Sequence, residues 1–550
     1  MSTKPVPAVV PSEDDRPPRD MRFWLIFLSL CVCGFITALE MGVISAALPT
    51  IVDDLHGSQF MWVGSAYALG ATALLPFSGG LAQLFGRRPV LLGSLALFAV
   101  GSVVCGAAKS MNTLIAGRTI QGLGGGGIIS LSQIVVADLV PLRERGSFNG
   151  LITLAYSVGC GISPIVGGSL AATGQWRWIF YLNVPICGLA AVLVVAFLRL
   201  RTPPGTLREK LQRIDYIGNI LVVGATTSTV LALTWGGIQF SWGSANILVP
   251  LIVGLCGLAV FLIYEARFAA HPMVPFDVMS TRTGLSGYAQ TFFTSMILIT
   301  IIYYLQVYFQ ACYNVSPTAA GVDGLGVAFI TAPVGLFAGI VIQKTHSYRV
   351  PLWIGWIWIV VGIALLGTLD ADTGRGKAIG YSIIAAIGMG TLILGSYFPV
   401  LAPVSVTKNA HALAFFVFLR NFSLVWGVTV GGTVLQNQLH KRLPAEFAAQ
   451  FPGGVEIAYA AIPLIRTLEE PLKTQVRNAF ADSLKIVWWV TTGIAGLGLL
   501  CSLGMKHYPL HTSVDRDWGL DEADNSRMIE LESNRPGKRE SHEASGEEEL

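Results

Sequence analysis

The chain has 550 residues, of which 53% are hydrophobic and only 13% are charged, and its mean hydropathy is +0.61. About a quarter of the residues in a soluble domain are charged, so this composition excludes a soluble protein and indicates an integral membrane protein. The net charge of +3 is small and the basic residues are dispersed, which gives no support for a nucleic-acid partner.

The first 22 residues are polar and include several prolines and acids, so we expect a disordered cytoplasmic segment rather than a cleaved signal peptide. A helix needs about 20 largely apolar residues to cross a bilayer. Runs that meet this requirement begin near Phe23, Met61, Val90, Leu114, Phe148, Trp178, Ile214, Ile247, Gly287, Val327, Leu352, Ala378, Ala412 and Ile486. These fourteen expected spans place both termini on one side, and the Lys and Arg residues of alternate connections put that side in the cytoplasm.

Two charged residues, Glu40 and Arg118, lie deep in the first and fourth apolar runs. A carboxyl group in mid-membrane pays a large desolvation cost when it is ionised, which favours reversible protonation. We therefore expect Glu40 to carry coupled protons, with a permanently protonated glutamic acid in one helix–helix hydrogen bond as the alternative. Arg118 is expected to tune the Glu40 site or to pair with substrate, the alternative being a salt bridge that only packs helices.

The connection between the second and third runs contains Gly79, Gly86 and the pair Arg87–Arg88. Arginine cannot lie in hydrocarbon, so this stretch should form a tight turn at the cytoplasmic face, with glycines that let two helices approach closely. It resembles the signature loop between helices 2 and 3 of the major facilitator superfamily. Gln83 stands where that family usually has an aspartate.

Asp138 follows the fourth run and is succeeded by Arg143 and Arg145, an arrangement that also resembles the superfamily. A carboxylate at a helix end beside arginines favours an ion pair with Arg87 or Arg88, which would help to close the cytoplasmic side. Because Gln83 carries no charge, we expect Asp138 to bear more of this closure than is usual. The stretch Leu114–Gly122 resembles a further family motif, whose arginine is thought to take part in proton transfer.

The fifth run resembles a motif that is characteristic of exporters in the superfamily, with a serine in place of one glycine. Its residues are Gly159, Ser163, Pro164, Gly167 and Gly168. Proline removes a backbone hydrogen bond and glycine permits a close crossing, so we expect a kinked, leak-tight helix contact. The resemblance implies antiport.

The chain has fourteen expected spans, and two of them, after residue 214, are additional to the usual twelve. This arrangement resembles the fungal type of the fourteen-spanner drug:proton antiporters. The resemblance implies an all-α membrane fold of two six-helix bundles and two linker helices. The expected parts are a cytoplasmic N-terminus at 1–22, a first bundle at 23–200, a linker with two transmembrane helices at 201–283, a second bundle at 284–505 with a long extracellular loop at 439–482, and a disordered cytoplasmic tail at 506–550.

Polar residues of the second bundle are candidates for a central substrate cavity. Together with Gln121 of the Arg118 motif, they are Tyr304, Gln306, Tyr308, Arg420 and Asn421. Helical spacing puts Tyr304 and Tyr308 on one face and Gln306 on a neighbouring one. An interfacial aromatic belt remains an equal explanation for the tyrosines.

Taken together, these patterns predict a proton-coupled exporter of small amphipathic organic compounds, such as drugs, toxins or secondary metabolites. Import by proton symport and a transporter-like nutrient receptor are the alternatives. The glycine run at 124–127 lacks the phosphate-loop pattern, so an ion gradient is the expected energy source and no enzyme activity, cofactor or metal is expected. The expected partners are substrate, protons and lipid, with a monomer in the plasma membrane or, alternatively, the vacuolar membrane.

Overall fold

The computed structural model describes residues 20–55, 61–199, 215–236, 240–269, 276–405, 408–448 and 464–510, with isolated positions in the intervening segments. In these ranges the long elements are all α-helices, as predicted. Thirteen spans are long and apolar enough to cross a membrane, and α2 (Met61–Phe85) makes fourteen when its two halves are counted as one span. Those halves meet at 51°, and Pro76 in the break has no N–H to continue the helix.

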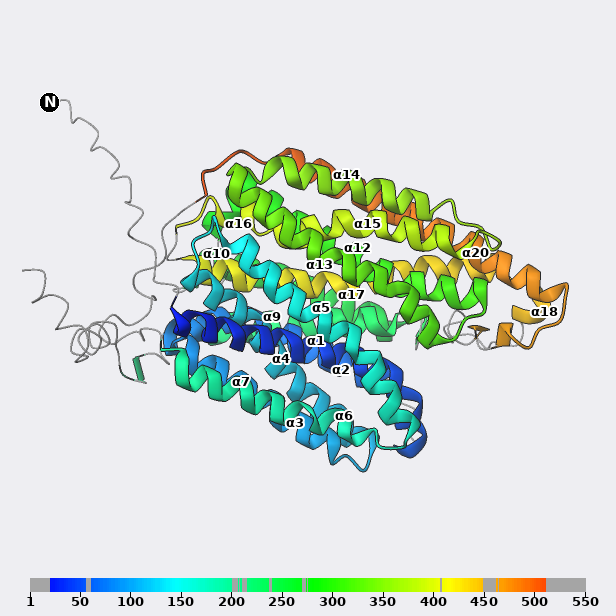
Figure 1. Cartoon of the computed structure of the whole chain (residues 1–550), viewed down its shortest axis with the longest axis horizontal. Helices are drawn as coiled ribbons and strands as arrows, with labels where there is room; N and C mark the ends of the chain where they lie inside the picture. The colour runs from blue at the N-terminus through cyan, green and yellow to red at the C-terminus, as the bar shows by residue number, and fades with distance from the viewer. Residues whose placement is uncertain are drawn as a thin grey trace, which may run out of the picture.

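The first bundle is formed by the first six spans. Besides α2, its helices are α1 (Met21–Leu55), α3 (Arg87–Gly106), α4 (Met111–Leu139), α5 (Arg145–Ala172) and the consecutive pair α6 (Arg177–Tyr181) and α7 (Asn183–Phe197). In Figure 1 this bundle lies in the lower half, with α5 beside the other bundle.

The second bundle carries the last six spans, and the short α11 (Phe276–Met279) precedes it. Its helices are α12 (Arg282–Tyr313), α13 (Pro317–Thr345), α14 (Arg349–Leu366), α15 (Arg375–Gly395) with α16 (Phe398–Leu401), α17 (Asn409–Arg442) with α18 (Ala445–Ala448), and α20 (Leu472–Leu503). The start of α1 and the end of α20 lie at the same end of the molecule (Figure 1), as an even number of spans requires.

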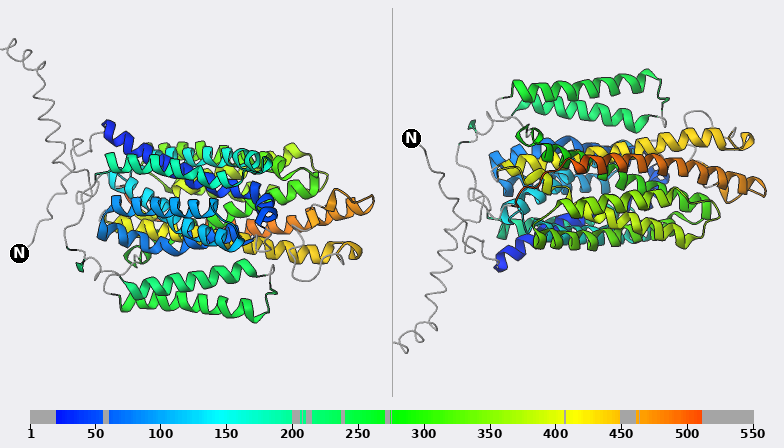
Figure 2. Two further views of the ribbon diagram at one scale, coloured as in Figure 1. Left: turned by 90° about the horizontal axis from the view of Figure 1, so that it is seen from below. Right: turned by 90° about the horizontal axis from the view of Figure 1, so that it is seen from above.

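The linker helices α9 (Tyr216–Trp235) and α10 (Ala245–Arg267) form a hairpin beside the two bundles, visible as a separate pair in Figure 2. The hairpin contacts both bundles through α9. The Trp235 ring lies 5.7 Å from that of Trp62 in α2, and Thr429 of α17 donates a hydrogen bond to the carbonyl of Leu233 at 3.2 Å. The linker is therefore a packed element across the seam between α2 and α17.

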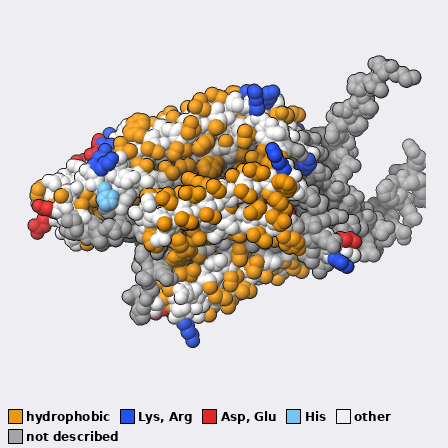
Figure 3. Space-filling view, turned by 180° about the vertical axis from the view of Figure 1, so that it is seen from behind, with side chains coloured by type: hydrophobic (Ala, Val, Ile, Leu, Met, Phe, Trp, Pro, Cys, Tyr) orange, Lys and Arg blue, Asp and Glu red, His pale blue; other side chains and the backbone are white. Residues whose placement is uncertain are grey.

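Hydrophobic side chains cover the body of the molecule, and Lys and Arg side chains gather toward its ends (Figure 3). Many of the exposed apolar side chains belong to α10, such as Ile252 and Val253. An apolar band with charged ends matches the hydrocarbon core and interfaces of a bilayer.

The two bundles touch closely at the end of the molecule where α1 begins and α20 ends. A Cβ added to Gly146 at the start of α5 would lie 2.8 Å from the Cα of Gly339 near the end of α13. A Cβ on Gly79 in α2 would lie 2.6 Å from the Cβ of Ala414 in α17. Real Cβ atoms do not approach so closely, so only glycine permits these crossings. The bundles are accordingly closed against each other at this end, which the sequence predicts to be the cytoplasmic side.

The structure describes parts of two segments that the sequence places outside the bundles. In the range 439–482, α17 continues to Arg442 and α20 begins at Leu472, so helices fill both ends of the expected loop. Residues 506–510, expected in the tail, pack against the second bundle: Lys506 N–H donates to Thr283 Oγ1 at 2.9 Å, and Tyr348 donates its hydroxyl to the Lys506 carbonyl at 2.7 Å. Burial raises the pKa of Tyr348 to about 12, so this hydroxyl keeps its proton. The expected segments 1–19 and 511–550 lie outside the described residues.

Candidate functional site

The first bundle contains a buried ion pair between Glu40 of α1 and Arg118 of α4. The two residues are 1% and 2% exposed, and Arg118 Nη1 donates directly to Glu40 Oε1. Arg118 Nε also donates to the carbonyl of Val63 in α2 at 2.9 Å. A charge buried this deeply is tolerable only when it is paired and hydrogen-bonded, and both conditions hold here.

Amide side chains complete the surroundings of the pair. Asn183, the first residue of α7, donates to Glu40 Oε2, and Gln121 accepts from Arg118 Nη1 at 2.7 Å. Gln121 in turn donates to Ser102 Oγ of α3 at 2.9 Å. Five helices thus contribute to one buried polar network. Gln121, a candidate substrate residue, lies in this network at 0% exposure, and its substrate role stays a prediction.

Close helix crossings bring the network together. A Cβ on Gly122 would lie 2.2 Å from the carbonyl oxygen of Tyr67, so the glycine run of α4 lets α2 approach within backbone contact. This places the Tyr67 ring 4.6 Å from the guanidinium carbon of Arg118, within the range of a cation–π contact. Tyr67 and Asn183 also belong to this network, and the sequence-based analysis assigned neither of them to a site.

The expected ion pair at the turn between α2 and α3 is present between Arg87 and Asp138. Arg87 Nε donates to Asp138 Oδ2 at 2.8 Å, and Arg87 Nη1 donates to the carbonyl of Ala82 at 2.9 Å. Gly86 has a φ of 91°, a conformation that suits the turn and favours glycine. Arg88 donates instead to the carbonyl of Val195. All these residues belong to the first bundle, so the Arg87–Asp138 pair shapes the turn and does not bridge the two bundles.

Contacts between the bundles come from other polar residues. The amide nitrogen of Gln83 lies 2.8 Å from Nδ1 of His411 at the start of α17. On the opposite seam, Ser147 donates to Gln343 Oε1 at 2.9 Å, and Arg143 donates to the Gln343 carbonyl at 3.4 Å. Gln83 therefore keeps an inter-bundle contact although it lacks the family's charge. The sequence-based analysis did not identify His411 or Gln343.

Arg145, also expected at the gate, is fully buried and points back to α4. It donates to the carbonyls of Val140 at 2.7 Å and Ala137 at 2.5 Å. These carbonyls lie at the C-terminal end of α4, where helix carbonyls lack intrahelical donors. Arg145 thus caps the end of α4, the end that carries Asp138.

The fifth-helix motif packs against α1. A Cβ on Gly159 would lie 2.7 Å from the Phe35 carbonyl, and one on Gly167 would lie 2.5 Å from the Val43 carbonyl. Ser163 packs on Gly42, where an added Cβ would lie 1.9 Å from the serine Oγ. The helices therefore cross at backbone contact along this motif. Gly168 faces open space, and the side chain of Pro164 lies outside the described residues.

The candidate substrate residues of the second bundle are dispersed. Tyr304 donates its hydroxyl to the carbonyl of Val428 at 2.6 Å, and Tyr308 donates to the carbonyl of Asp370 at 2.8 Å, so both tyrosines are buried and engaged. Asn421 donates to the carbonyl of Val417 in its own helix at 2.9 Å. Gln306 and Arg420 are half-buried. Their substrate roles stay predictions.

Comparisons with known proteins agree with this geometry. The sequence profile of the Major Facilitator Superfamily matches residues 30–428. The efflux pump FUS6 of Gibberella moniliformis is 35% identical over 96% of each chain. The acurin A biosynthesis cluster MFS-type transporter of Aspergillus aculeatus is 35% identical over 93% of this chain and 94% of its own.

Solved structures share the arrangement of the helices. The proton:xylose symporter XylE superposes with a TM-score of 0.55 at 15% identity, covering 89% of this chain and 98% of the symporter. At this level of identity the likeness concerns the fold alone.

Proposed function

We propose that this chain, which belongs to the Major Facilitator Superfamily, exports small amphipathic organic compounds in exchange for protons. It is a multi-pass membrane transporter and not an enzyme. Export is supported by relatives that are named as efflux pumps and by the close crossing of α1 and α5 along the exporter motif. A relative named for a biosynthesis cluster favours secondary metabolites among the possible substrates.

The observation that carries proton coupling is the buried pair of Glu40 and Arg118. A proton that reaches Glu40 neutralises the carboxylate and removes the charge that compensates the Arg118 guanidinium. The buried cation then loses much of its stabilisation, so the two protonation states favour different arrangements of the helices around it. Proton binding can thereby shift a conformational equilibrium.

α2 provides a route from this pair to the cytoplasmic gate. One half of the bent helix presents the Val63 carbonyl to Arg118, and the other half carries Gly79 and Gln83 against α17. A change in the bonds of Arg118 therefore acts on the element that closes the cytoplasmic side. In the proposed cycle, substrate binds from the cytoplasm to the deprotonated protein, and protons from outside drive release and return.

A flux assay in vesicles tests this proposal. Inverted vesicles, whose cytoplasmic face points outward, are prepared with an acidic lumen and offered a panel of fluorescent amphipathic dyes. Antiport predicts accumulation of dye in the lumen that a protonophore abolishes. Dye extrusion with protons would instead identify a symporter, and absence of flux with every dye at verified insertion would favour a receptor.

We further propose a monomer, since one chain supplies the spans of both bundles, and a location in the plasma membrane, since export across it removes the compound from the cell. Imaging of a fluorescent fusion tests the location. A signal confined to the vacuolar membrane would replace this part of the proposal.

A further inference from the structure

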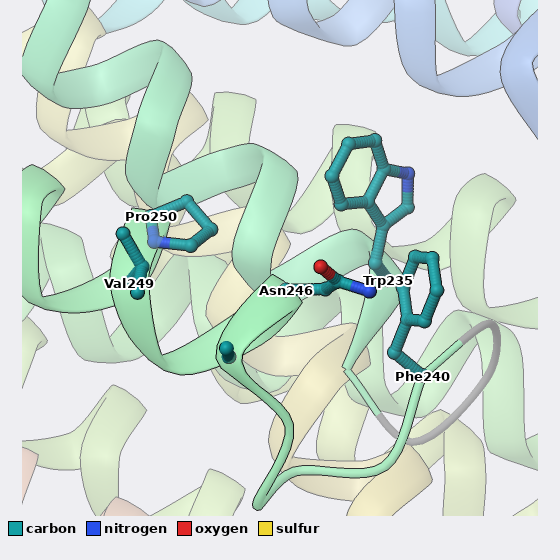
Figure 4. Close-up of a pocket in the computed structure, with 6 residues that line it drawn as sticks. Trp235, Phe240, Asn246, Val249 and Pro250 are labelled. Atoms are coloured by element: carbon teal, nitrogen blue, oxygen red, sulfur yellow. The ribbon is translucent and has the colours of Figure 1, made fainter.

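A cavity lies where α9 and α10 are joined, outside the two bundles. Its volume is about 530 Å³, and it is lined by Trp235, Phe240, Ala245, Asn246, Val249 and Pro250. Figure 4 shows the side-chain amide of Asn246 beside the rings of Trp235 and Phe240, while Val249 and Pro250 line the cavity from the next turn of α10. The transport cycle proposed above uses none of these residues.

The position of the cavity determines whether a ligand reaches it from water or from the lipid bilayer. α9 begins after a basic cytoplasmic connection and ends at Trp235, so the turn of the hairpin lies at the extracellular interface. Beyond the cavity, α10 presents exposed apolar side chains such as Ile252, Val253 and Val260. The cavity therefore opens toward the outer leaflet of the bilayer.

Polar groups in the cavity lack bonds that ordinary helices would provide. Pro250 has no N–H, so the helix bond that would reach the carbonyl of Asn246 four residues earlier is absent. The side-chain amide of Asn246 is exposed at the cavity, where it can donate and accept hydrogen bonds. A ligand that supplies one hydroxyl group would therefore find a hydrogen-bond partner here.

None of the six lining residues is charged, and most are apolar or aromatic. A phospholipid headgroup would bring a phosphate without a cationic partner, at a large desolvation cost. A neutral lipid with a flat apolar body and a single hydroxyl fits better, because rings stack on Trp235 and Phe240 while the hydroxyl reaches Asn246. We propose that this cavity binds a membrane sterol of the outer leaflet.

Sterol at this site would act on both bundles. Trp235 contacts Trp62 in α2, and the neighbouring Leu233 carbonyl accepts from Thr429 in α17. A ligand that orders the end of α9 therefore stiffens the seam between α2 and α17. The expected consequence is a transport rate that depends on the sterol content of the membrane.

Photolabelling of the full chain tests the proposal. The protein is reconstituted in phosphatidylcholine vesicles with a photoreactive sterol, and the labelled peptides are identified. Val249→Trp fills the cavity, and Asn246→Leu removes the polar side chain. Val260→Trp is the matched control, because Val260 is similarly exposed and lies about three turns further along the same face of α10.

The expected result is labelling at the end of the hairpin that falls at least fivefold in Val249→Trp and Asn246→Leu, is competed by unlabelled sterol, and is unchanged in Val260→Trp. Equal labelling in all variants, or labelling spread along α10, would overturn the proposal. So would equal labelling by a photoreactive phosphatidylcholine, which would show a general lipid contact. The thermal unfolding temperature of each variant is measured as well, because a native value shows that reduced labelling does not result from misfolding.

Discussion

Two adjacent glycines in α2 allow the cytoplasmic closure to be tested by a single methyl group. In Gly79→Ala the added Cβ would lie 2.6 Å from the Cβ of Ala414 and 3.2 Å from the carbonyl of Ala410, both in the other bundle. In Gly80→Ala the added Cβ meets nothing within 4 Å. Both changes gain the same helix propensity, about 1 kcal/mol, so they differ only in the clash across the seam.

Overpacking of this kind costs about 1–3 kcal/mol, and the cost applies only while the bundles are in contact. The equilibrium should therefore shift away from the closed cytoplasmic side by about 5- to 150-fold in Gly79→Ala and should not shift in Gly80→Ala.

Thiol labelling in inverted vesicles reports this shift. With the eight native cysteines replaced, Ser147→Cys introduces a thiol at a position whose hydroxyl contacts Gln343 across the α5–α13 seam. An impermeant maleimide should label it 5- to 150-fold faster in the Gly79→Ala background than in the parent or in Gly80→Ala. Equal rates in all three proteins would refute the argument that these glycines hold the cytoplasmic side closed.

Three further predictions concern the polar contacts. Arg118→Ala is expected to abolish proton-driven flux at unchanged expression. Arg118→Lys should restore little flux, because an ammonium group cannot reproduce the several hydrogen bonds of a planar guanidinium group. Normal flux in Arg118→Ala would show that Arg118 is purely structural. Asp138→Asn breaks the buried pair with Arg87, at a cost of about 3–5 kcal/mol, so an unchanged thermal unfolding temperature would argue against its contribution. Gln83→Asp places a carboxylate beside His411 and should slow labelling of the introduced thiol, whereas faster labelling would contradict closure at this contact.

Hydropathy was sufficient to predict the spans but not their ends. The last apolar run begins near Ile486, whereas α20 begins at Leu472. The helix has several polar turns before its apolar stretch, and hydropathy does not detect them. Arg477 in these turns donates to the Cys312 carbonyl at 2.8 Å, which ties the extension to α12. Such a bond joins segments distant in sequence, so no local pattern reveals it.

The candidate sites show the same division between local and distant signals. Glu40 and Arg118 were recognisable because a charge in a membrane span is costly and therefore rare. Asn183 and His411 were not, since an amide or imidazole at the start of a span has many ordinary explanations, and their partners are 143 and 328 residues away. Only the packing of the helices identifies them.

The most direct test of the proposed coupling compares Glu40→Gln with Thr37→Val in vesicles. Thr37 is a buried polar residue one turn away in α1, and its hydroxyl bonds only to carbonyls of its own helix in the described structure. Each variant is assayed for dye exchange without a pH gradient and for uphill accumulation with one. The account predicts that Glu40→Gln keeps exchange and loses accumulation, while Thr37→Val keeps both. Normal pH-driven accumulation in Glu40→Gln would contradict the assignment of proton coupling to this carboxyl group.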